Sequence, residues 1–579
     1  MRKETYTLHA MITITLDGTP VKVKKTATIL EAAKKAGIAI PTLCNHPDLP
    51  ASGTCGMCVV SVTGREGSVR ACATVVEEGM VVTTVAPELV AERKANLEVL
   101  LGHHVLECDD CVFLQKCHLL ELVREYGAKP TGKKQDTDLV LRSGTIVFDQ
   151  TKCIGCGNCA RVCPTGYLSI NPLTGKLELA DDPKVECINC GQCIIHCPVG
   201  AIEGVGEFEE LERIFADGSK TVVVQFAPSI RTSIGEEFGM EAGSVATGQL
   251  VAALRKVGFK HVFDTAAGAD FTTMEEAAEV VDRIRSGGPL PAMTSCCPSW
   301  VKFVEFYYPE FIPNLASSRS PQIMLGGIVK EYWSHKVGMR PEDIEMVSIM
   351  PCVSKKAEAG REELKIDGRF PVDRVLTTRE LARLFRKRGI DLSKLEPEAA
   401  DDPFGVPSGA GVIYGSSGGV FESAFRTAYY LMTKEELPED AMQEIRGIDG
   451  RKEKIVTIGE TTIRICVVSG LDNARKVLKE LKKDPRKYDA LEVMTCPGGC
   501  IGGGGQPIPT SSEIVKKRSA GLYSIDKKGT LRVAHQSKPV QAIYREFFNT
   551  EAARKKILHT KYARRGKADV ETLRDSRQM

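Results

Sequence analysis

The chain has 579 residues, of which 42% are hydrophobic and 26% charged, and its formal net charge is +2. This length suggests about four domains, and the near-neutral balance lacks the basic field that nucleic-acid binding needs. No run of about 18 apolar residues predicts a membrane span, and residues 1–10 lack the apolar segment of a secretory signal, so we expect a cytoplasmic protein.

Cysteine is the most informative residue of the composition, with 21 copies. The cysteines stand in tight groups with gaps of two and three residues, separated by long cysteine-free stretches. Such gaps suit metal ligands better than long-range disulfides, and disulfides are rare in long chains without an export signal. The groups are therefore interpreted as metal sites.

Residues 1–90 predict a small domain of the β-grasp type, in which strands surround one helix. An alternating strand meets a hairpin turn at Asp17-Gly18. A capping box at Thr28 opens a helix that ends at Gly37.

The first cysteine group lies in this segment and has the spacing of a plant-type ferredoxin. It consists of Cys44, Cys55, Cys58 and Cys72. Thiolates at this spacing predict a [2Fe-2S] cluster. A structural zinc site is the alternative, and it is disfavoured because the spacing is not that of paired Cys-x2-Cys motifs.

Residues 91–143 predict a mostly helical segment with a second ligand group. The group consists of His104, Cys108, Cys111 and Cys117. It suits a [4Fe-4S] cluster, and taken alone a Cys3His zinc site fits it equally well. Because it directly follows a [2Fe-2S] segment, it resembles the entry region of the large iron–sulfur subunit of respiratory NADH dehydrogenases, which favours the cluster.

Residues 144–206 contain the same cysteine pattern twice, as an internal repeat. The pattern is that of bacterial two-cluster ferredoxins, in which each fourth cysteine crosses to the other cluster. One [4Fe-4S] cluster is predicted at Cys153, Cys156, Cys159 and Cys197. The other is predicted at Cys187, Cys190, Cys193 and Cys163.

Residues 207–558 change period, and short β-branched runs alternate with amphipathic helices. This alternation predicts α/β layers with parallel strands. The expected strands are residues 221–226, 261–264, 291–295, 346–350, 374–378, 464–469 and 491–494. Residues 559–579 predict a charged, mobile tail.

Three further cysteine motifs each follow one of these strands, at residues 294–300, 350–358 and 492–507. In open α/β sheets, sites form at the carboxyl ends of strands. Four thiolates from three strand ends can therefore converge on one cubane cluster. The cysteines of these motifs are Cys296, Cys297, Cys352, Cys496 and Cys500.

The three motifs resemble those of the [FeFe]-hydrogenases: Thr-Ser-Cys-Cys-Pro, Met-Pro-Cys-x2-Lys-x2-Glu, and Glu-x-Met-x-Cys-x3-Cys-x2-Gly-Gly-Gly-Gln-Pro. The likeness covers residues 11–560 in the family's full-length domain order. It implies a two-lobed α/β domain with an H-cluster, which is a [4Fe-4S] cluster plus a diiron centre carrying CO, cyanide (CN) and azadithiolate. The implied cubane ligands are Cys297, Cys352, Cys496 and Cys500, the last of which also bridges to the diiron centre.

The same resemblance implies roles for the surrounding residues. Cys296, beside a ligand, passes protons to the bridging amine. Lys355 hydrogen-bonds a cyanide in a charge-assisted contact. Glu358 is the last residue of the same motif. The other positions that match the pocket around the diiron unit are Ser229, Gln322, Met350 and Met494.

Glu276, Glu279 and Arg283 lie at i, i+3 and i+7, so they share one face of a predicted helix. Without the resemblance this face indicates an exposed ion pair, and with it the face matches the family's proton-relay helix. The family commonly has a serine, in Asn-Leu-Ser-Ser, where this chain has Ala316. Either a water or Ser317 substitutes for that hydroxyl, or proton transfer is slower.

These features predict a hydrogenase that interconverts H2 with protons and electrons through a wire of one [2Fe-2S] and three [4Fe-4S] clusters. No Gly-x-Gly-x2-Gly follows a strand, so NAD(P) is not expected to bind this chain. The electron partner is either ferredoxin, for a monomer, or flavin-containing NAD(P)-binding subunits of a complex, which could be electron-bifurcating. The long wire favours the complex, and a diiron centre implies maturation proteins.

Three other functions compete with this interpretation. A non-catalytic electron-transfer or assembly protein is disfavoured by the intact Cys296 and cubane ligands. A sensory hydrogenase would carry an added sensor domain and lack that cysteine. An NADH-dehydrogenase subunit would lack the three motifs after the strands. The remaining cysteine, Cys466, lies in an apolar strand and is expected to be a small buried hydrophobe.

Overall fold

The computed structural model describes residues 10–102, 104, 108, 111, 113, 117–129, 140–438, 441–458 and 461–566. The chain folds as two compact units. The first comprises the residues up to Arg142, Val147–Ala180 and His196–Glu203, and the second comprises Ser143–Ile146, Asp181–Ile195 and the residues from Gly204 onward.

The N-terminal part of the first unit is a five-stranded sheet in the order β2-β1-β5-β3-β4, with α1 in the same hydrophobic core. The elements are β1 (Met11–Leu16), β2 (Thr19–Lys24), α1 (Ile29–Lys35), β3 (Val59–Val62), β4 (Ser68–Arg70) and β5 (Val81–Thr83). Asp17 and Gly18 turn the hairpin with φ values of 47° and 82°, the left-handed backbone that a tight hairpin needs. Thr28 and Glu31 form the expected capping box of α1.

Helices and short strands make up the rest of the first unit. They are α2 (Pro87–Leu101), α3 (His118–Tyr126), β6 (Val140–Ser143), β7 (Ile146–Asp149), α4 (Asn158–Arg161), β8 (Leu168–Ile170), β9 (Leu177–Leu179) and β10 (Ile202–Gly204). α2 packs on α3, and β8 pairs with β9 as an antiparallel hairpin. The short α5 (Gln192–Ile195) belongs to the second unit.

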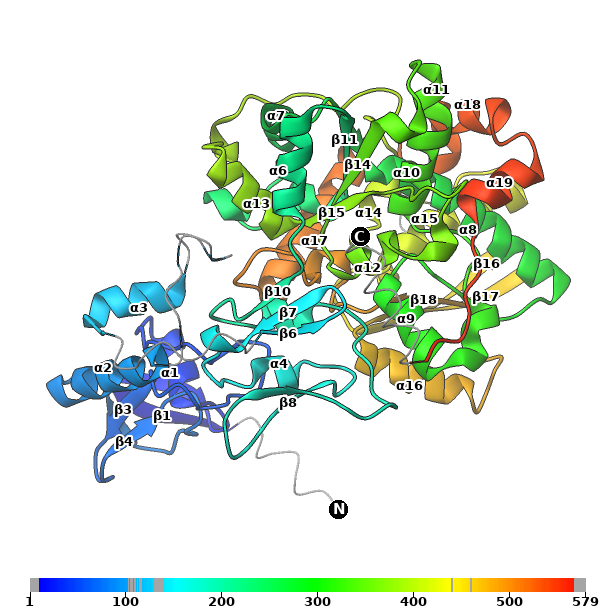
Figure 1. Cartoon of the computed structure of the whole chain (residues 1–579). Coiled ribbons are helices and arrows are strands. Elements are labelled where there is room, and N and C mark those ends of the chain that lie inside the picture. The colour runs from blue at the N-terminus through cyan, green and yellow to red at the C-terminus, as the bar shows by residue number, and fades with distance from the viewer. Residues whose placement is uncertain are drawn as a thin grey trace. The chain divides into compact units, whose positions relative to one another are not determined.

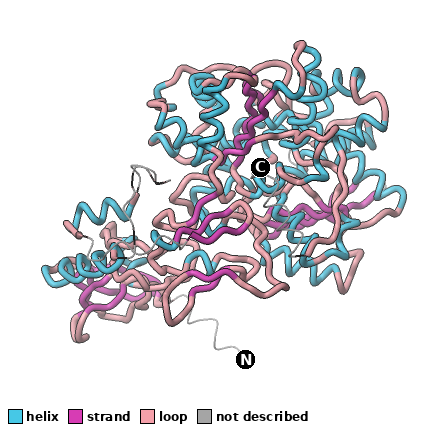
Figure 2. Tube along the Cα trace, viewed as in Figure 1, coloured by secondary structure: helices cyan, strands magenta, loops and turns pink. Residues whose placement is uncertain are grey.

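Two four-stranded sheets organise the second unit, and Figure 2 shows their strands as two separate magenta groups. The first sheet has the order β12-β11-β14-β15 and is wholly parallel. The second has the order β13-β18-β17-β16, with only β16 antiparallel. The strands are β11 (Thr221–Phe226), β12 (His261–Asp264), β13 (Ala292–Met293), β14 (Ile344–Met350), β15 (Arg374–Thr377), β16 (Arg451–Ile458), β17 (Thr461–Ser469) and β18 (Ala490–Met494).

The sequence of β14 shows why the first sheet is central. All seven of its residues are buried, as expected for a parallel strand covered on both faces. Its one charged side chain, Glu345, is paired with Lys220 at 2.8 Å and Arg374 at 3.0 Å. Helices α7 and α13 pack against this sheet (Figure 1).

The principal helices of the second unit surround both sheets. They are α6 (Phe208–Asp217), α7 (Thr247–Val257), α8 (Thr265–Ser286), α9 (Pro298–Tyr307), α10 (Pro321–Ile328), α12 (Ser354–Ala359), α13 (Thr378–Lys387), α14 (Gly409–Ile413), α15 (Gly419–Thr433), α16 (Leu471–Leu481), α17 (Ser512–Lys528), α18 (Lys538–Glu546) and α19 (Glu551–Leu558). None of the helices among the described residues is both long and apolar enough to cross a membrane.

Helix α8 carries several of the predicted site residues. It starts after Asp264, whose carboxylate caps the N–H of Ala266, and it ends at Gly287. It crosses α10 so closely that a Cβ on Gly268 would lie 2.3 Å from the carbonyl oxygen of Pro321. Only glycine permits this approach, which fixes the helix against the core.

The predicted strands of the α/β region are confirmed, two of them residue for residue. The predicted strand at residues 291–295 is shorter, because only Ala292–Met293 pairs with β18. Strand β16 was not predicted. Part of the predicted tail is also corrected: the Thr560 N–H donates to the Ser317 carbonyl at 2.8 Å, so the residues just after Leu558 are bonded to the domain.

Candidate iron–sulfur and catalytic sites

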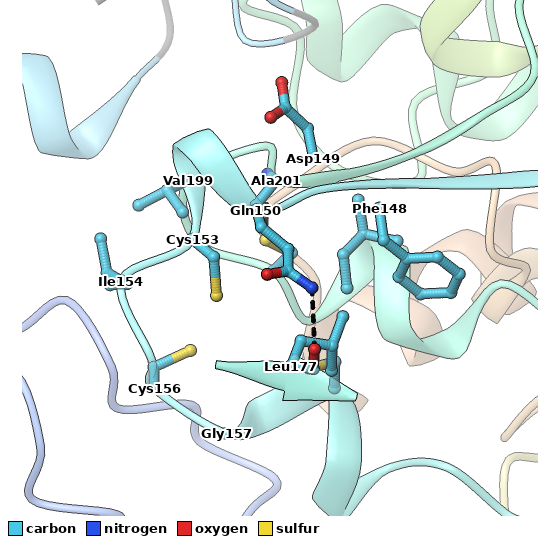
Figure 3. A pocket seen from close by; sticks show the side chains of 13 residues that line it. Phe148, Asp149, Gln150, Cys153, Ile154, Cys156, Gly157, Leu177, Val199 and Ala201 are labelled. Carbon is cyan, nitrogen blue, oxygen red and sulfur yellow. Dashed lines mark hydrogen bonds between the residues drawn. The ribbon is translucent and has the colours of Figure 1, made fainter. Parts of the chain in front are cut away.

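The first ferredoxin motif lines a cavity in the first unit (Figure 3). The cysteines in the cavity wall are Cys153, Cys156 and Cys159 of this motif and Cys197, the fourth cysteine of the second motif. Apolar side chains such as Phe148 and Leu177 complete the wall. In Figure 3 the sulfur atoms of Cys153 and Cys156 turn into the space that the loop encloses.

Burial raises the pKa of Cys156 to about 12 and that of Cys197 to about 11. Gathered thiols with such pKa values need a cation to exist as thiolates near neutral pH, and cluster iron provides one. The four residues therefore fit a [4Fe-4S] cluster.

The second ferredoxin motif contributes Cys187, Cys190 and Cys193 to the second unit, whereas Cys163 belongs to the first. Within the second unit, the Asn189 N–H donates to Cys187 Sγ at 3.4 Å. The cluster that would join Cys163 to these three residues stays a prediction.

The four cysteines of the N-terminal domain are all buried. Cys58 Sγ lies 3.3 Å from Cys72 Sγ, and the Cys44 N–H donates to Cys55 Sγ at 3.5 Å. A backbone N–H that points at sulfur is the contact that stabilises cluster thiolates. These residues fit the predicted [2Fe-2S] cluster.

His104 of the second ligand group is oriented for metal binding. Its Nδ1 lies 2.9 Å from the Lys152 carbonyl oxygen, and only a protonated nitrogen can bond to a carbonyl. Burial lowers the pKa of His104, which favours the neutral ring. Nε2 is then the nitrogen with a lone pair for a metal. Much of the connection between His104 and Cys117 lies outside the described residues, so this cluster also stays a prediction.

The described residues include no group of three or more His, Cys, Asp or Glu side chains arranged for a single metal ion. An iron–sulfur cluster makes a different demand, because its inorganic sulfides spread the iron atoms and their cysteine ligands over a larger volume.

The cysteines that follow β13, β14 and β18 converge within the second unit. Burial first, and then the charge of Cys297, raise the pKa of Cys352 and of Cys500 to about 12. Burial also raises the pKa of Cys496 well above the ordinary value, with contributions from Cys352 and Cys297. Such mutual repulsion requires short separations, so these four residues fit one cluster.

The glycine run after Cys500 packs against backbone. A Cβ on Gly503 would lie 2.4 Å from the Pro351 carbonyl oxygen, and one on Gly504 would lie 2.5 Å from Gly191 Cα. Only glycines let this loop press against the end of β14 and against the second ferredoxin motif. The glycines therefore allow a close approach of this loop to protein backbone on these sides.

A hydrogen-bond network surrounds the converging cysteines. Lys355 Nζ donates to the Cys296 carbonyl and to Glu358 Oε2, both at 2.9 Å. Gln322 Nε2 donates to the same carboxylate oxygen at 2.7 Å. Burial would lower the pKa of Lys355, but Glu358 outweighs it and raises the pKa, so the ammonium stays charged. Glu358 thus positions Lys355 rather than facing a reactant itself.

Two polar atoms at predicted pocket positions are buried without a hydrogen-bond partner among the described residues: Ser229 Oγ and Gln322 Oε1. An unsatisfied buried polar atom costs free energy, so each site needs a partner that the protein does not supply. Polar ligands of a bound cofactor would satisfy this need. Met350 and Met494 are both buried, and Met494 packs with Cys296, Tyr414 and Cys500.

The predicted relay residues lie on the C-terminal half of α8. Ser318 Oγ donates to Glu276 Oε1 at 3.1 Å, and Ser317 Oγ donates to Glu279 Oε2 at 3.0 Å. Arg283 is ion-paired with Glu279. Ser317 therefore contacts Glu279, one of the alternatives predicted for the missing hydroxyl of Ala316. Ser318, which contacts Glu276, was not among the predicted relay residues.

Burial raises the pKa of Glu276 from its ordinary value of 4.5 to about 8. Between these two pH values the folded chain keeps a proton that the unfolded chain has released, so stability falls as pH rises through this window. Replacing Glu276 by Gln removes the titration. We expect the variant to gain stability relative to the wild type between pH 5 and pH 9, by on the order of a few kcal/mol, as measured by denaturant midpoints.

An α/β domain with cysteines converging from three strand ends, joined to ferredoxin-like cluster motifs, defines an iron–sulfur oxidoreductase. Family models identify which one: "Iron only hydrogenase large subunit, C-terminal domain" matches residues 220–504 and "Iron hydrogenase small subunit" matches residues 512–565. A 2Fe-2S cluster binding domain matches residues 9–87, and a 4Fe-4S dicluster domain matches residues 152–201.

The similarity extends over nearly the whole chain. NADP-reducing hydrogenase subunit HndD of Solidesulfovibrio fructosivorans is 38% identical over 96% of this chain and 99% of its own. Iron hydrogenase 1 of Clostridium pasteurianum is 38% identical over 95% of this chain and 100% of its own. The structure of [FeFe]-hydrogenase HydA1 from Chlamydomonas reinhardtii matches with a TM-score of 0.55 and 38% identity, over 61% of this chain and 98% of that one. The chain belongs to the iron-only hydrogenase family, and it is an oxidoreductase that acts on H2.

Proposed function

We propose that this hydrogenase is the H2-forming subunit of an NAD(P)-linked complex. The observation that carries the proposal is the end-to-end similarity to a chain named as a subunit of an NADP-reducing hydrogenase. The sequence has no Gly-x-Gly-x2-Gly loop after a strand, so a flavin-containing partner would bind the nicotinamide. Such a complex could split electrons between NAD(P) and ferredoxin.

The proposed cofactors are one [2Fe-2S] cluster, three accessory [4Fe-4S] clusters and an H-cluster. The second ferredoxin motif is the candidate for the last step of electron delivery. The charge of Cys190 contributes to the raised pKa of Cys496, so this motif lies within electrostatic range of the converging cysteines. Maturation proteins would supply the diiron part.

The bound H-cluster would supply the chemistry of H2 bond making and breaking, and the protein supplies position and protons. The Cys296 thiol holds and moves a proton at Sγ. Lys355, fixed by Glu358, presents a charged donor toward the cofactor. Met350 and Met494 exclude water, and Ser229 and Gln322 offer the two unpartnered polar atoms.

The proposal is tested with the maturated chain alone under H2. We expect reduction of methyl viologen but no reduction of NAD(P)+, and we expect NAD(P)+ reduction to appear when a flavin-containing subunit that copurifies from the native host is added. The matched control is the same subunit without this chain, which should not reduce NAD(P)+ with H2.

The alternative is a monomer that exchanges electrons with ferredoxin. The chain is equally identical, at 38%, to Iron hydrogenase 1, whose name specifies neither a subunit nor NADP. Full turnover with ferredoxin as the sole partner, together with purification from the native host as a single chain, would support the monomer and contradict the complex. A cytoplasmic location is proposed for either form and is checked by cell fractionation.

A further inference from the structure

The predicted proton relay leads from Cys296 through Glu276 to Glu279. Its carboxylate is only partly exposed, at 17% of the side-chain surface. Its oxygens are engaged by Arg283 and Ser317, so an exchangeable partner of Ser317 can extend the route from Glu279 toward bulk water.

Arg283 is poorly suited to extend that route. Its guanidinium donates to the carbonyls of Asn314 and Leu315, both at 2.8 Å, and it is ion-paired with Glu279. An arginine does not lose its proton in proteins, so it cannot pass a proton by giving up its own. Arg283 holds the carboxylate in place and leaves transfer to other groups.

Ser317 connects Glu279 to a histidine. Ser317 Oγ lies 3.0 Å from Glu279 Oε2 and 2.9 Å from His559 Nδ1. On the far side of the ring, His559 Nε2 lies 2.8 Å from Glu275 Oε2. Tyr544 also donates its hydroxyl to Glu275. The result is an unbroken series of exchangeable groups from Glu279 through Ser317 to His559.

The carboxylate of Glu275 sets the orientation of the ring. Burial would raise the pKa of Glu275, but hydrogen bonds from His559 and Tyr544 outweigh it and lower the pKa, so Glu275 is ionised. A carboxylate accepts only from N–H, which places the proton of the neutral ring on Nε2. Nδ1 then faces Ser317 with its lone pair, ready to accept a proton, as in hydrolase triads.

The backbone holds this arrangement. The Arg319 N–H donates to the Leu558 carbonyl at 2.7 Å, and the Thr560 N–H donates to the Ser317 carbonyl at 2.8 Å. Arg319 Nε donates to the His559 carbonyl at 2.8 Å. The segment after α19 is thus hydrogen-bonded to residues 317–319, here called the serine loop. The His559 side chain is 22% exposed, which gives water access to the ring.

We propose that His559 is the proton-exchange group between Glu279 and solvent, by way of Ser317. The proposal rests on the relay that begins at Cys296. In the outward direction, the Glu279 carboxyl proton moves to Ser317 Oγ while the Ser317 hydroxyl proton moves to His559 Nδ1. The imidazolium that forms is held by Glu275 and then loses a proton to water. In the inward direction the same bonds form and break in reverse, and no electrons are involved.

The charged and titratable groups around the ring come from four elements. Glu275 and Glu279 lie on α8, Arg319 lies on the serine loop, and Arg554 of α19 acts on Glu275 through space. Tyr544 of α18 adds a neutral hydroxyl. The two carboxylates favour the imidazolium, and the positive charges of the two arginines oppose it.

The test compares His559→Gln with the wild type as maturated, full-length proteins. Formation of HD from D2 in H2O reports proton exchange without the accessory clusters. We expect a drop of about tenfold or more in HD formation and in H2 evolution, a changed pH profile of the rate, and an unchanged KM for methyl viologen. Infrared bands of CO and cyanide should not change.

His535 provides a matched control. Its Nδ1 lies 3.2 Å from Thr427 Oγ1 and its Nε2 lies 3.0 Å from Glu436 Oε1, so it has the same kinds of partner away from the relay. His535→Gln should keep wild-type exchange and the wild-type pH profile. In His559→Ala, added imidazole should restore exchange.

A second measurement needs no cofactor. In the full chain before maturation, mass-spectrometric exchange at the ring carbon reports the protonation of each histidine. Glu275→Gln should disfavour the charged ring of His559, because the carboxylate that accepts from it is gone, and should leave His535 unchanged.

If His559→Gln exchanges protons at the wild-type rate with the wild-type pH profile, the proposal is overturned. If the wild type itself forms no HD, the hydrogenase function fails instead, so the two failures are distinguishable.

Discussion

Replacing Cys296 by Ala is expected to lower H2 evolution from reduced methyl viologen by about a thousandfold. The Cys296 side chain is buried beside Tyr414, Met494 and Cys500. Burial raises its pKa well above the ordinary value, and the charge of Glu276 adds to this, so the thiol is neutral and can both donate and accept a proton. Alanine can do neither. The rate is measured anaerobically on maturated protein.

The infrared bands of CO and cyanide separate proton transfer from cofactor binding. They should persist in Cys296→Ala, because the four proposed cubane ligands are untouched. Cys466→Ala is the matched control. Cys466 is fully buried in β17, and the charges that shift its pKa are those of Arg451, Glu453 and Glu480, so its loss should leave the rate unchanged. Disappearance of the bands in Cys296→Ala would show that Cys296 holds the cofactor, and an unchanged rate would exclude it from the relay.

Local signals made the strands and the ligands of this fold predictable. The run that forms β14 is almost continuously apolar, and a cysteine motif follows directly, so the strand and the placement of Cys352 at its end could both be read from the sequence. The same logic applied to β18 and Cys496. Parallel strands bring their carboxyl ends to one edge, which turns distant motifs into neighbours.

Features without a strong local pattern were not predictable. Strand β16 has a weak alternation of polar and apolar residues and exists because β17 pairs with it at the sheet edge. Ser318 and His559 carry no pattern of their own. They become relay candidates only because the segment after α19 pairs with the serine loop, more than 200 residues earlier, as the bridge between Ser318 and His559 shows.

Replacing Glu305 by Gln is expected to destabilise the second unit by about 3–5 kcal/mol. Glu305 of α9 is fully buried, and Arg361 donates to its two carboxylate oxygens at 2.6 and 3.1 Å. Arg565 pairs with the same carboxylate at 3.3 Å. The substitution keeps the shape but leaves two largely buried guanidinium groups with one carboxylate fewer, since Glu363 alone of their two shared partners remains charged. Anaerobic denaturant unfolding measures the loss.

The position of this pair links stability to the site. Helix α9 begins directly after Cys297, and Arg361 follows α12, which begins shortly after Cys352. The ion pair therefore joins the two segments that carry the proposed ligands Cys297 and Cys352. Its loss should also lower the iron content of the purified chain. Asp343→Asn is the matched control, because Arg340 and Asp343 form an equally short pair at 2.6 Å that is 71% and 41% exposed. An exposed pair contributes little, so this variant should keep both stability and iron. An equal loss in the two variants would contradict the argument, because burial would then not decide the cost of removing the carboxylate.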